Sequence, residues 1–119
     1  MLRMQVLDRM PELGREGAGV KTWSQNRLVV VGPTQALDRF KASQWQAMMR
    51  TRHAELLETS VSRFACQFET DAPPIAPLQD LSCRWPELVF LFDYEVESNR
   101  TKGVAKAKTG KLDHWSVRY

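Results

Sequence analysis

The sequence predicts an α+β fold in which helices pack on one face of a single antiparallel β-sheet. The predicted order of elements is β-α-β-α-β-β, with a further strand allowed at the end, and short turns join the last strands. Two segments alternate apolar and polar residues, as strands do when they bury one side only. The chain has 119 residues, of which 43% are hydrophobic, so it can bury one core in one domain.

Residues 1–22 are expected to form a flexible N-terminal arm before a single domain at 23–119. Apolar residues recur in this segment at near-helical spacing, but Pro11 and the three glycines after it limit any helix. The alternative is a short helix that covers a sheet edge or contacts a partner. Polar residues interrupt the apolar stretch too often for a secretory signal.

The core is predicted to begin with a buried strand at residues 27–31, whose sequence is RLVVV. Gly32-Pro33 ends this strand, and Pro33 fits the first turn of a helix because its missing N–H costs nothing there. Apolar residues at steps of three and four extend that helix from Thr34 to Glu58, which corresponds to about 37 Å. A compact domain of this size favours shorter helices, so we expect a break near Ala42–Gln44.

Residues 61–68 alternate, with Phe64, Cys66 and Phe68 as the apolar set, and they predict a half-buried strand. Pro73-Pro74 ends it. A short helix with one apolar face is predicted to follow over residues 75–82, and Trp85-Pro86 ends that helix.

The run at residues 88–92 is apolar on both faces and predicts a central strand. It continues into an alternation that places Phe92, Tyr94 and Val96 on one side and three acidic residues on the other. The acidic residues are Asp93, Glu95 and Glu97.

Two hairpins are predicted at the C-terminal end. A turn centred on Ser98-Asn99 would place Glu97 opposite Lys102 and Asp93 opposite Lys106. A two-residue turn at Thr109-Gly110 would place Lys106 opposite Asp113 and Val104 opposite Trp115.

The formal net charge of +3 conceals two segments of opposite sign. Residues 69–97 contain seven acidic residues and one basic residue, whereas residues 100–119 contain six basic residues and one acidic residue. In the predicted hairpins these segments lie on neighbouring strands, where opposite charges pair across the sheet.

Motifs that carry catalysis or bind a metal are absent from the sequence. His53, on a predicted polar helix face, and His114 show no ligand spacing with a cysteine, so neither metal nor cofactor is expected. Cys66 lies on an apolar strand face and is expected to be buried and unreactive, and Cys83 is also expected in the core. Asp93 and Glu95 could act as acid and base, but their alternation opposite lysines favours a solvated face. We therefore expect no enzymatic activity.

The candidate partner-binding site combines five cations with one aromatic side chain of the C-terminal segment. These residues are Arg100, Lys102, Lys106, Lys108, Lys111 and Trp115. A basic hairpin can follow phosphates while aromatic side chains stack on bases, so nucleic-acid binding is one hypothesis. Acidic residues on the neighbouring strand would cancel much of this field. Segregated charge is also suited to steering a protein partner.

Three segments together resemble the Api-like domain family of phage and plasmid proteins. They are residues 23–33 (WSQNRLVVVGP), residues 68–74 (FETDAPP) and residues 81–90 (LSCRWPELVF). Ser24 replaces the cysteine that is usual in the family, and the family's tryptophan before the two prolines is absent. The resemblance implies a ferredoxin-like fold and a mobile-element origin. It transfers no catalytic residue, because the members are largely uncharacterised.

The leading hypothesis is a non-enzymatic, cytoplasmic interaction module of a mobile genetic element. Its partner would be a host protein or nucleoprotein complex, such as a defence complex that an anti-CRISPR-type protein inhibits. The alternative is an accessory protein that binds nucleic acid through the basic hairpin. No membrane association is expected, and an exposed edge strand could pair two copies into a homodimer.

Overall fold

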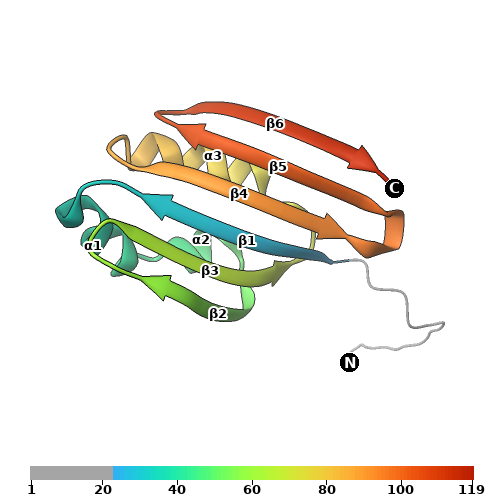
Figure 1. Cartoon of the computed structure of the whole chain (residues 1–119), viewed down its shortest axis with the longest axis horizontal. Coiled ribbons are helices and arrows are strands. Elements are labelled where there is room, and N and C mark those ends of the chain that lie inside the picture. The colour runs from blue at the N-terminus through green and yellow to red at the C-terminus, as the bar shows by residue number, and fades with distance from the viewer. Residues whose placement is uncertain (1–22) are drawn as a thin grey trace.

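The structure is a computed structural model, and it describes residues 23–119. The predicted arm at residues 1–22 lies outside the described residues. A six-stranded antiparallel sheet forms one layer and three helices form the other, so the predicted α+β fold with helices on one face is confirmed (Figure 1). The elements in chain order are β1 (Ser24–Val31), α1 (Thr34–Lys41), α2 (Trp45–Met49), β2 (Arg52–Thr59), β3 (Arg63–Thr70), α3 (Ile75–Arg84), β4 (Val89–Val96), a 3₁₀ turn (Glu97–Asn99), β5 (Thr101–Lys108) and β6 (Lys111–Arg118).

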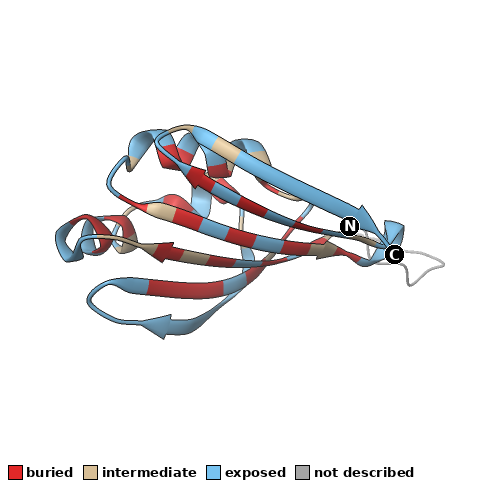
Figure 2. Ribbon diagram, turned by 45° about the horizontal axis from the view of Figure 1, so that its top comes forward, coloured by how far each residue is buried: buried red, intermediate tan, exposed pale blue. Residues whose placement is uncertain are grey.

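The strand order across the sheet is β2-β3-β1-β4-β5-β6. β1 therefore lies inside the sheet and pairs with β3 on one side and with β4 on the other. Leu28 of β1 lies between Cys66 and Phe92, and all three side chains point toward the helices and are buried. Figure 2 shows the alternation of buried and exposed segments along the inner strands of the sheet, whereas the edge strands β2 and β6 contain no buried residue.

Aromatic side chains fill the space between the helices and the sheet. Phe40 of α1 is completely buried and stacks on Trp45 of α2 with ring centroids 5.4 Å apart. It also contacts Phe90 of β4 and Trp85 edge-on, at 5.5 Å and 5.8 Å. Such ring pairs add to the stability gained from buried area alone.

The predicted helix over residues 34–58 is only partly present. α1 ends at Lys41 and α2 begins at Trp45, so the predicted break near Ala42–Gln44 is confirmed. The extension to Glu58 is wrong, because Arg50 adopts the left-handed conformation at φ 57° and ends α2. From Arg52 the chain pairs with β3 instead of coiling further.

β2 is an irregular edge strand. Every residue in it is exposed, and its register against β3 shifts twice. His53, which the sequence places on a helix, lies in this strand at φ 53°. Register shifts and positive φ values bend an edge strand and weaken its capacity to pair further.

The other predicted elements are present: β1 and α3 are longer than predicted, and β3 is shifted by two residues toward the C-terminus. β3 buries Phe64, Cys66 and Phe68 as predicted, and α3 covers the predicted short helix. β4 lies between β1 and β5 as a central strand, and the optional last strand is β6. None of the helices within residues 23–119 is long and apolar enough to cross a membrane.

One of the two predicted hairpin registers is wrong. The 3₁₀ turn and Arg100, at φ 54°, lengthen the first connection beyond a two-residue turn. Glu95 consequently faces Lys102, and Asp93 faces Val104. The second hairpin has the predicted register, with Val104 opposite Trp115.

Gly103 provides the space for a tyrosine ring. It lies directly opposite Tyr94 in the β4–β5 ladder, and a Cβ atom built on Gly103 would lie 2.2 Å from the Tyr94 ring. The ring therefore lies across the backbone of β5, and its hydroxyl lies 2.7 Å from Nε2 of His114 on β6. This contact connects three neighbouring strands on the helix side of the sheet.

We predict that Gly103→Ala lowers the free energy of unfolding by about 1–3 kcal/mol, because the added methyl group overlaps the Tyr94 ring. Chemical denaturation of the wild type, G103A, Y94A and the double variant measures this effect. The double variant should lose less stability than the two single changes predict together, because the overlap is then absent. Additive losses would contradict this account of Gly103.

Candidate functional site

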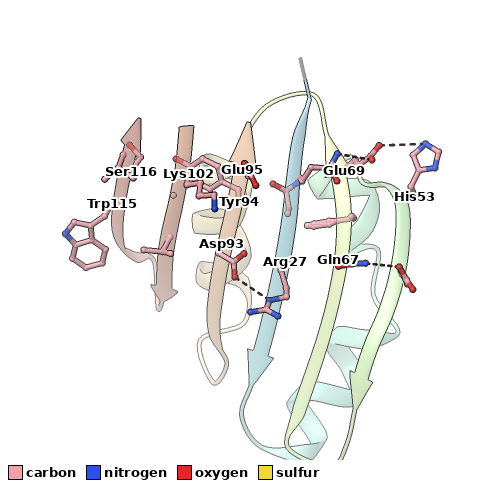
Figure 3. A pocket seen from close by; sticks show the side chains of 17 residues that line it. Arg27, His53, Gln67, Glu69, Asp93, Tyr94, Glu95, Lys102, Trp115 and Ser116 are labelled. Atoms are coloured by element: carbon pink, nitrogen blue, oxygen red, sulfur yellow. Dashed lines mark hydrogen bonds and ion pairs between the residues drawn. The ribbon is translucent and has the colours of Figure 1, made fainter. Parts of the chain in front are cut away.

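The sheet face opposite the helices, which we call the open face, is a surface available to a partner. No element within residues 23–119 packs on it (Figure 2). A shallow hollow of about 720 Å³ extends across it from His53 and Glu55 of β2 to Trp115 and Val117 of β6. Figure 3 shows the side chains that line this hollow.

A row of six side chains crosses the open face at one level. The register aligns Glu55, Gln67, Arg27, Asp93, Val104 and Trp115. Arg27 Nε lies 3.5 Å from Asp93 Oδ2, and Gln67 Nε2 donates a 2.8 Å hydrogen bond to Glu55 Oε1. Polar groups therefore occupy the four strands from β2 to β4, and apolar groups occupy β5 and β6.

Glu69 is the centre of a second polar group at the end of the face where β1 begins. Gln25 Nε2 donates a 3.1 Å hydrogen bond to Glu69 Oε2, and His53 Nε2 lies 3.9 Å from Glu69 Oε1. Glu95 lies on the far side of Gln25 in the same row. Half of the open face thus carries a concentration of carboxylates.

The β5–β6 half of the face carries an apolar patch. Trp115 and Val117 are each 64% exposed, and Val104, directly opposite Trp115, is 51% exposed. We call these three residues the Trp115 patch. A contiguous patch of exposed apolar side chains marks an interaction site more often than a single exposed apolar side chain does.

Tyr119 borders the Trp115 patch. Its hydroxyl donates a hydrogen bond to a carboxylate oxygen of Glu95, and this bond is the main cause that raises the pKa of Tyr119. The Arg100 guanidinium carbon and the Lys102 ammonium lie 5.2 Å and 5.5 Å from the centre of the Tyr119 ring. Cations at this distance from an aromatic face are attracted to it.

The structure brings five of the six sequence-predicted site residues onto the open face. In β5, Gly103, Ala105 and Ala107 are buried on the helix side, so Lys102, Lys106 and Lys108 point away from the helices. Lys111 and Trp115 share their side because they lie opposite Lys108 and Val104. Arg100 is separate from these five, in the turn between β4 and β5.

The four lysines of this face are poorly neutralised. Lys108 lies directly opposite Lys111, a pairing of like charges that destabilises a hairpin. Within residues 23–119, none of the four has a carboxylate within 4.0 Å. Most acidic side chains of the face lie on the opposite half, and they are Glu55, Glu58, Glu69, Asp93 and Glu95. Asp113 lies on the lysine half, opposite Lys106. The open face is therefore basic on one side and acidic on the other.

Sequence reasoning missed the β2, β3 and β1 part of the hollow. Gln25 and Arg27 alternate with buried residues from Ser24 onward, and this signal could have extended the first strand. His53 and Glu55 offered no comparable signal, because both faces of β2 are exposed.

The two cysteines differ in environment. Cys66 is buried, and this burial raises the pKa of its thiol to about 12, which leaves it without a reactive thiolate. Cys83 is exposed, so its predicted place in the core is wrong. It follows Ser82, the α3 residue that points into the core, and lies toward the β5–β6 turn at Gly110.

The described residues include no group of three or more histidine, cysteine, aspartate or glutamate side chains that could hold a metal ion. A buried polar group is present at the start of β1, but its members satisfy one another. Ser24 Oγ donates to Asn26 Oδ1 at 2.6 Å, and Asn26 Nδ2 donates to Thr70 Oγ1 at 2.9 Å. Its role is to hold β1 to β3, since buried polar groups are stable only when they are hydrogen-bonded.

Comparisons of the chain with models of known protein families, with curated proteins and with solved structures found no match.

We predict that a thiol reagent at pH 8 modifies one cysteine per native chain. Because the pKa of Cys66 is about 12, roughly one Cys66 thiol in ten thousand is ionised at that pH. Cys83 should react at once and Cys66 only after denaturation, as mass spectrometry of the labelled peptides would show. In the matched variant C83S no native thiol should react. Rapid labelling of Cys66 in folded C83S would contradict its burial.

Proposed function

We propose that this chain is a non-enzymatic protein-interaction module that binds its partner through the β5–β6 half of the open face. One observation carries the proposal: Trp115, 64% exposed, stands with two valines on a sheet face that no described helix covers. Charged residues of both signs border this apolar patch, as polar residues surround the apolar centre of protein interfaces. They are Lys102, Lys106, Asp93 and Asp113. Buried tryptophans at such centres commonly contribute most of the binding energy.

The distribution of charge favours a protein over a nucleic acid as the partner. A surface that follows phosphates needs cations along its whole path. Here Glu95 lies opposite Lys102 in the ladder, and Asp113 lies opposite Lys106. A protein surface that carries both signs can complement this arrangement, and an excess of acidic residues would suit the β5–β6 half.

A ferredoxin-like assignment is part of the proposal. β1 and β2 are both antiparallel to β3, which separates them, and β3 and β4 are both antiparallel to β1. Helices connect β1 to β2 and β3 to β4, so two split β-α-β units interlock, as in ferredoxin-like folds. β5 and β6 extend this unit at the β4 side.

The resemblance to the Api-like family supports the biological setting that we propose. A cytoplasmic module of a phage, plasmid or integrated element would bind a host protein or nucleoprotein complex and inhibit it, as anti-CRISPR-type proteins inhibit defence complexes.

We predict that Trp115→Ala and Val117→Ala weaken capture of a specific protein partner from extracts of the source organism. Loss of a central interface tryptophan costs 2 kcal/mol or more in typical complexes, about a thirtyfold loss of affinity. Val61→Ala is the matched control, because Val61 is 71% exposed but lies at the β2–β3 turn, away from the patch. Quantitative mass spectrometry compares the captured proteins. Equal capture by all three variants would remove the Trp115 patch from the proposal.

Nucleic-acid binding is the alternative, and the aromatic rings beside Lys102 and Arg100 are the observation that favours it. We predict no retardation of single- or double-stranded nucleic acid in gels, even at low salt. The matched variants K106E/K108E and R39E/R84E change the net charge equally, on the open face and on the helix layer respectively. Retardation by the wild type that only K106E/K108E abolishes would establish the alternative.

A further inference from the structure

The two edges of the sheet differ in their capacity to accept another strand. β2 forms one edge, and its two register shifts and the positive φ of His53 disrupt it. β6 forms the other edge, and its eight residues pair with β5 without any shift. No described element covers the outer side of β6, which lies at the rim of the sheet in Figure 1. A long, regular and uncovered edge is a template for pairing with another chain.

The hydrogen-bond pattern shows which residues of β6 face outward. The Tyr119 N–H donates to the Arg100 carbonyl, which continues the β5–β6 ladder. Because alternate residues of a strand direct their amides to opposite sides, Trp115 and Val117 also bond toward β5. The amides that point away from β5 therefore belong to Leu112, His114, Ser116 and Arg118.

We propose that β6 pairs with β6 of a second copy of this chain, antiparallel about a two-fold axis at Trp115. In this register all residues from 111 to 119 of one copy lie opposite residues 111 to 119 of the other. On the open face it places Lys111 opposite Tyr119 and Asp113 opposite Val117, so a cation meets an aromatic ring and no like charges meet. On the helix side Leu112 meets Arg118 and His114 meets Ser116, again without like charges.

A shift by two residues in either direction is less favourable. One shift would place His114 opposite His114 of the second copy, and the other would place His114 opposite Arg118. Both shifts also shorten the overlap of the two strands. The self-complementarity of the central register is the argument for a second copy as the occupant, since an isologous contact must match itself.

Trp115 lies at a position of this pairing that lacks direct hydrogen bonds to the second copy, because its own amide bonds toward β5. Residues that face each other at such positions have Cα atoms about 4.5 Å apart. The two Trp115 side chains would therefore contact each other on the open face. The inference does not depend on the function proposed above, because it concerns the backbone edge of β6 and not a foreign partner.

A proline at residue 116 tests the edge directly. Its missing N–H would remove an outward donor and leave the β5 ladder intact, and edge strands tolerate proline at such positions. We expect the wild type and the matched variant S116A to sediment as dimers at micromolar concentration. S116P should remain folded, as circular dichroism would show. Its dimer should dissociate at a concentration roughly tenfold or more above that at which the wild-type dimer dissociates. A monomeric wild type, or a folded S116P that dimerises normally, would overturn the proposal.

Engineered disulfides test the register, even if S116P fails to fold. In a C83S background, W115C places two sulfurs across the two-fold axis within the range that a disulfide spans. V117C is the matched control, because its symmetry mate lies four residues along the strand, about 13 Å away. Mild oxidation should crosslink W115C/C83S into a covalent dimer and leave V117C/C83S uncrosslinked. Equal crosslinking of the two variants, or none of W115C/C83S, would overturn the register.

Discussion

The position of β1 between β3 and β4 is the constraint on which the other features of this protein depend. Leu28 and Val30 point toward the helices and are completely buried, so β1 contributes the centre of the core. A shift of one residue in either of its two ladders would turn the side chains of the neighbouring strand to the other face. The pairing of β1 with both neighbours therefore determines which residues of β3 and β4 reach water.

The open face is the consequence of covering the sheet on one side only. Antiparallel sheets tolerate a solvated face when its side chains are polar. The β2–β4 half of this face follows that rule in pairs such as Arg27 and Asp93, with Leu91, 39% exposed, as an exception. The β5–β6 half departs from it at Trp115 and Val117. Nothing in the packing of the core requires these two side chains to be apolar, since neither contributes to the buried cluster. Their exposure is therefore consistent with the binding role proposed for the Trp115 patch.

Strands with one buried face could be predicted from the sequence, whereas a strand with both faces exposed could not. Phe64, Cys66 and Phe68 alternate visibly, and β3 was predicted from them. In β2 the alternation is absent because all residues are exposed, and Leu56 and Leu57 instead continue the helical spacing of Met48 and Met49.

The β4–β5 register was mispredicted for a local reason. Arg100 adopts a positive φ after a 3₁₀ turn, and no residue type in that turn demands it. The faces of Lys102, Lys106 and Lys108 were nevertheless predictable, because an error of two residues preserves the side of the sheet.

The uneven distribution of charge on the open face has a consequence for the proposed dimer, in which the open faces of two copies adjoin along β6. Pairing of two copies along β6 would place both β5–β6 halves at the centre of one continuous sheet and both carboxylate-rich halves at its ends. The central strip would then contain two Trp115 patches and the lysines of both copies, including Lys108 and Lys111, which already face each other within one chain. Repulsion in such a strip is relieved by an acidic surface placed over it, whereas an uncharged surface leaves it unrelieved. The two proposals together therefore predict a partner that is acidic, extends over both copies and presents apolar groups near its centre.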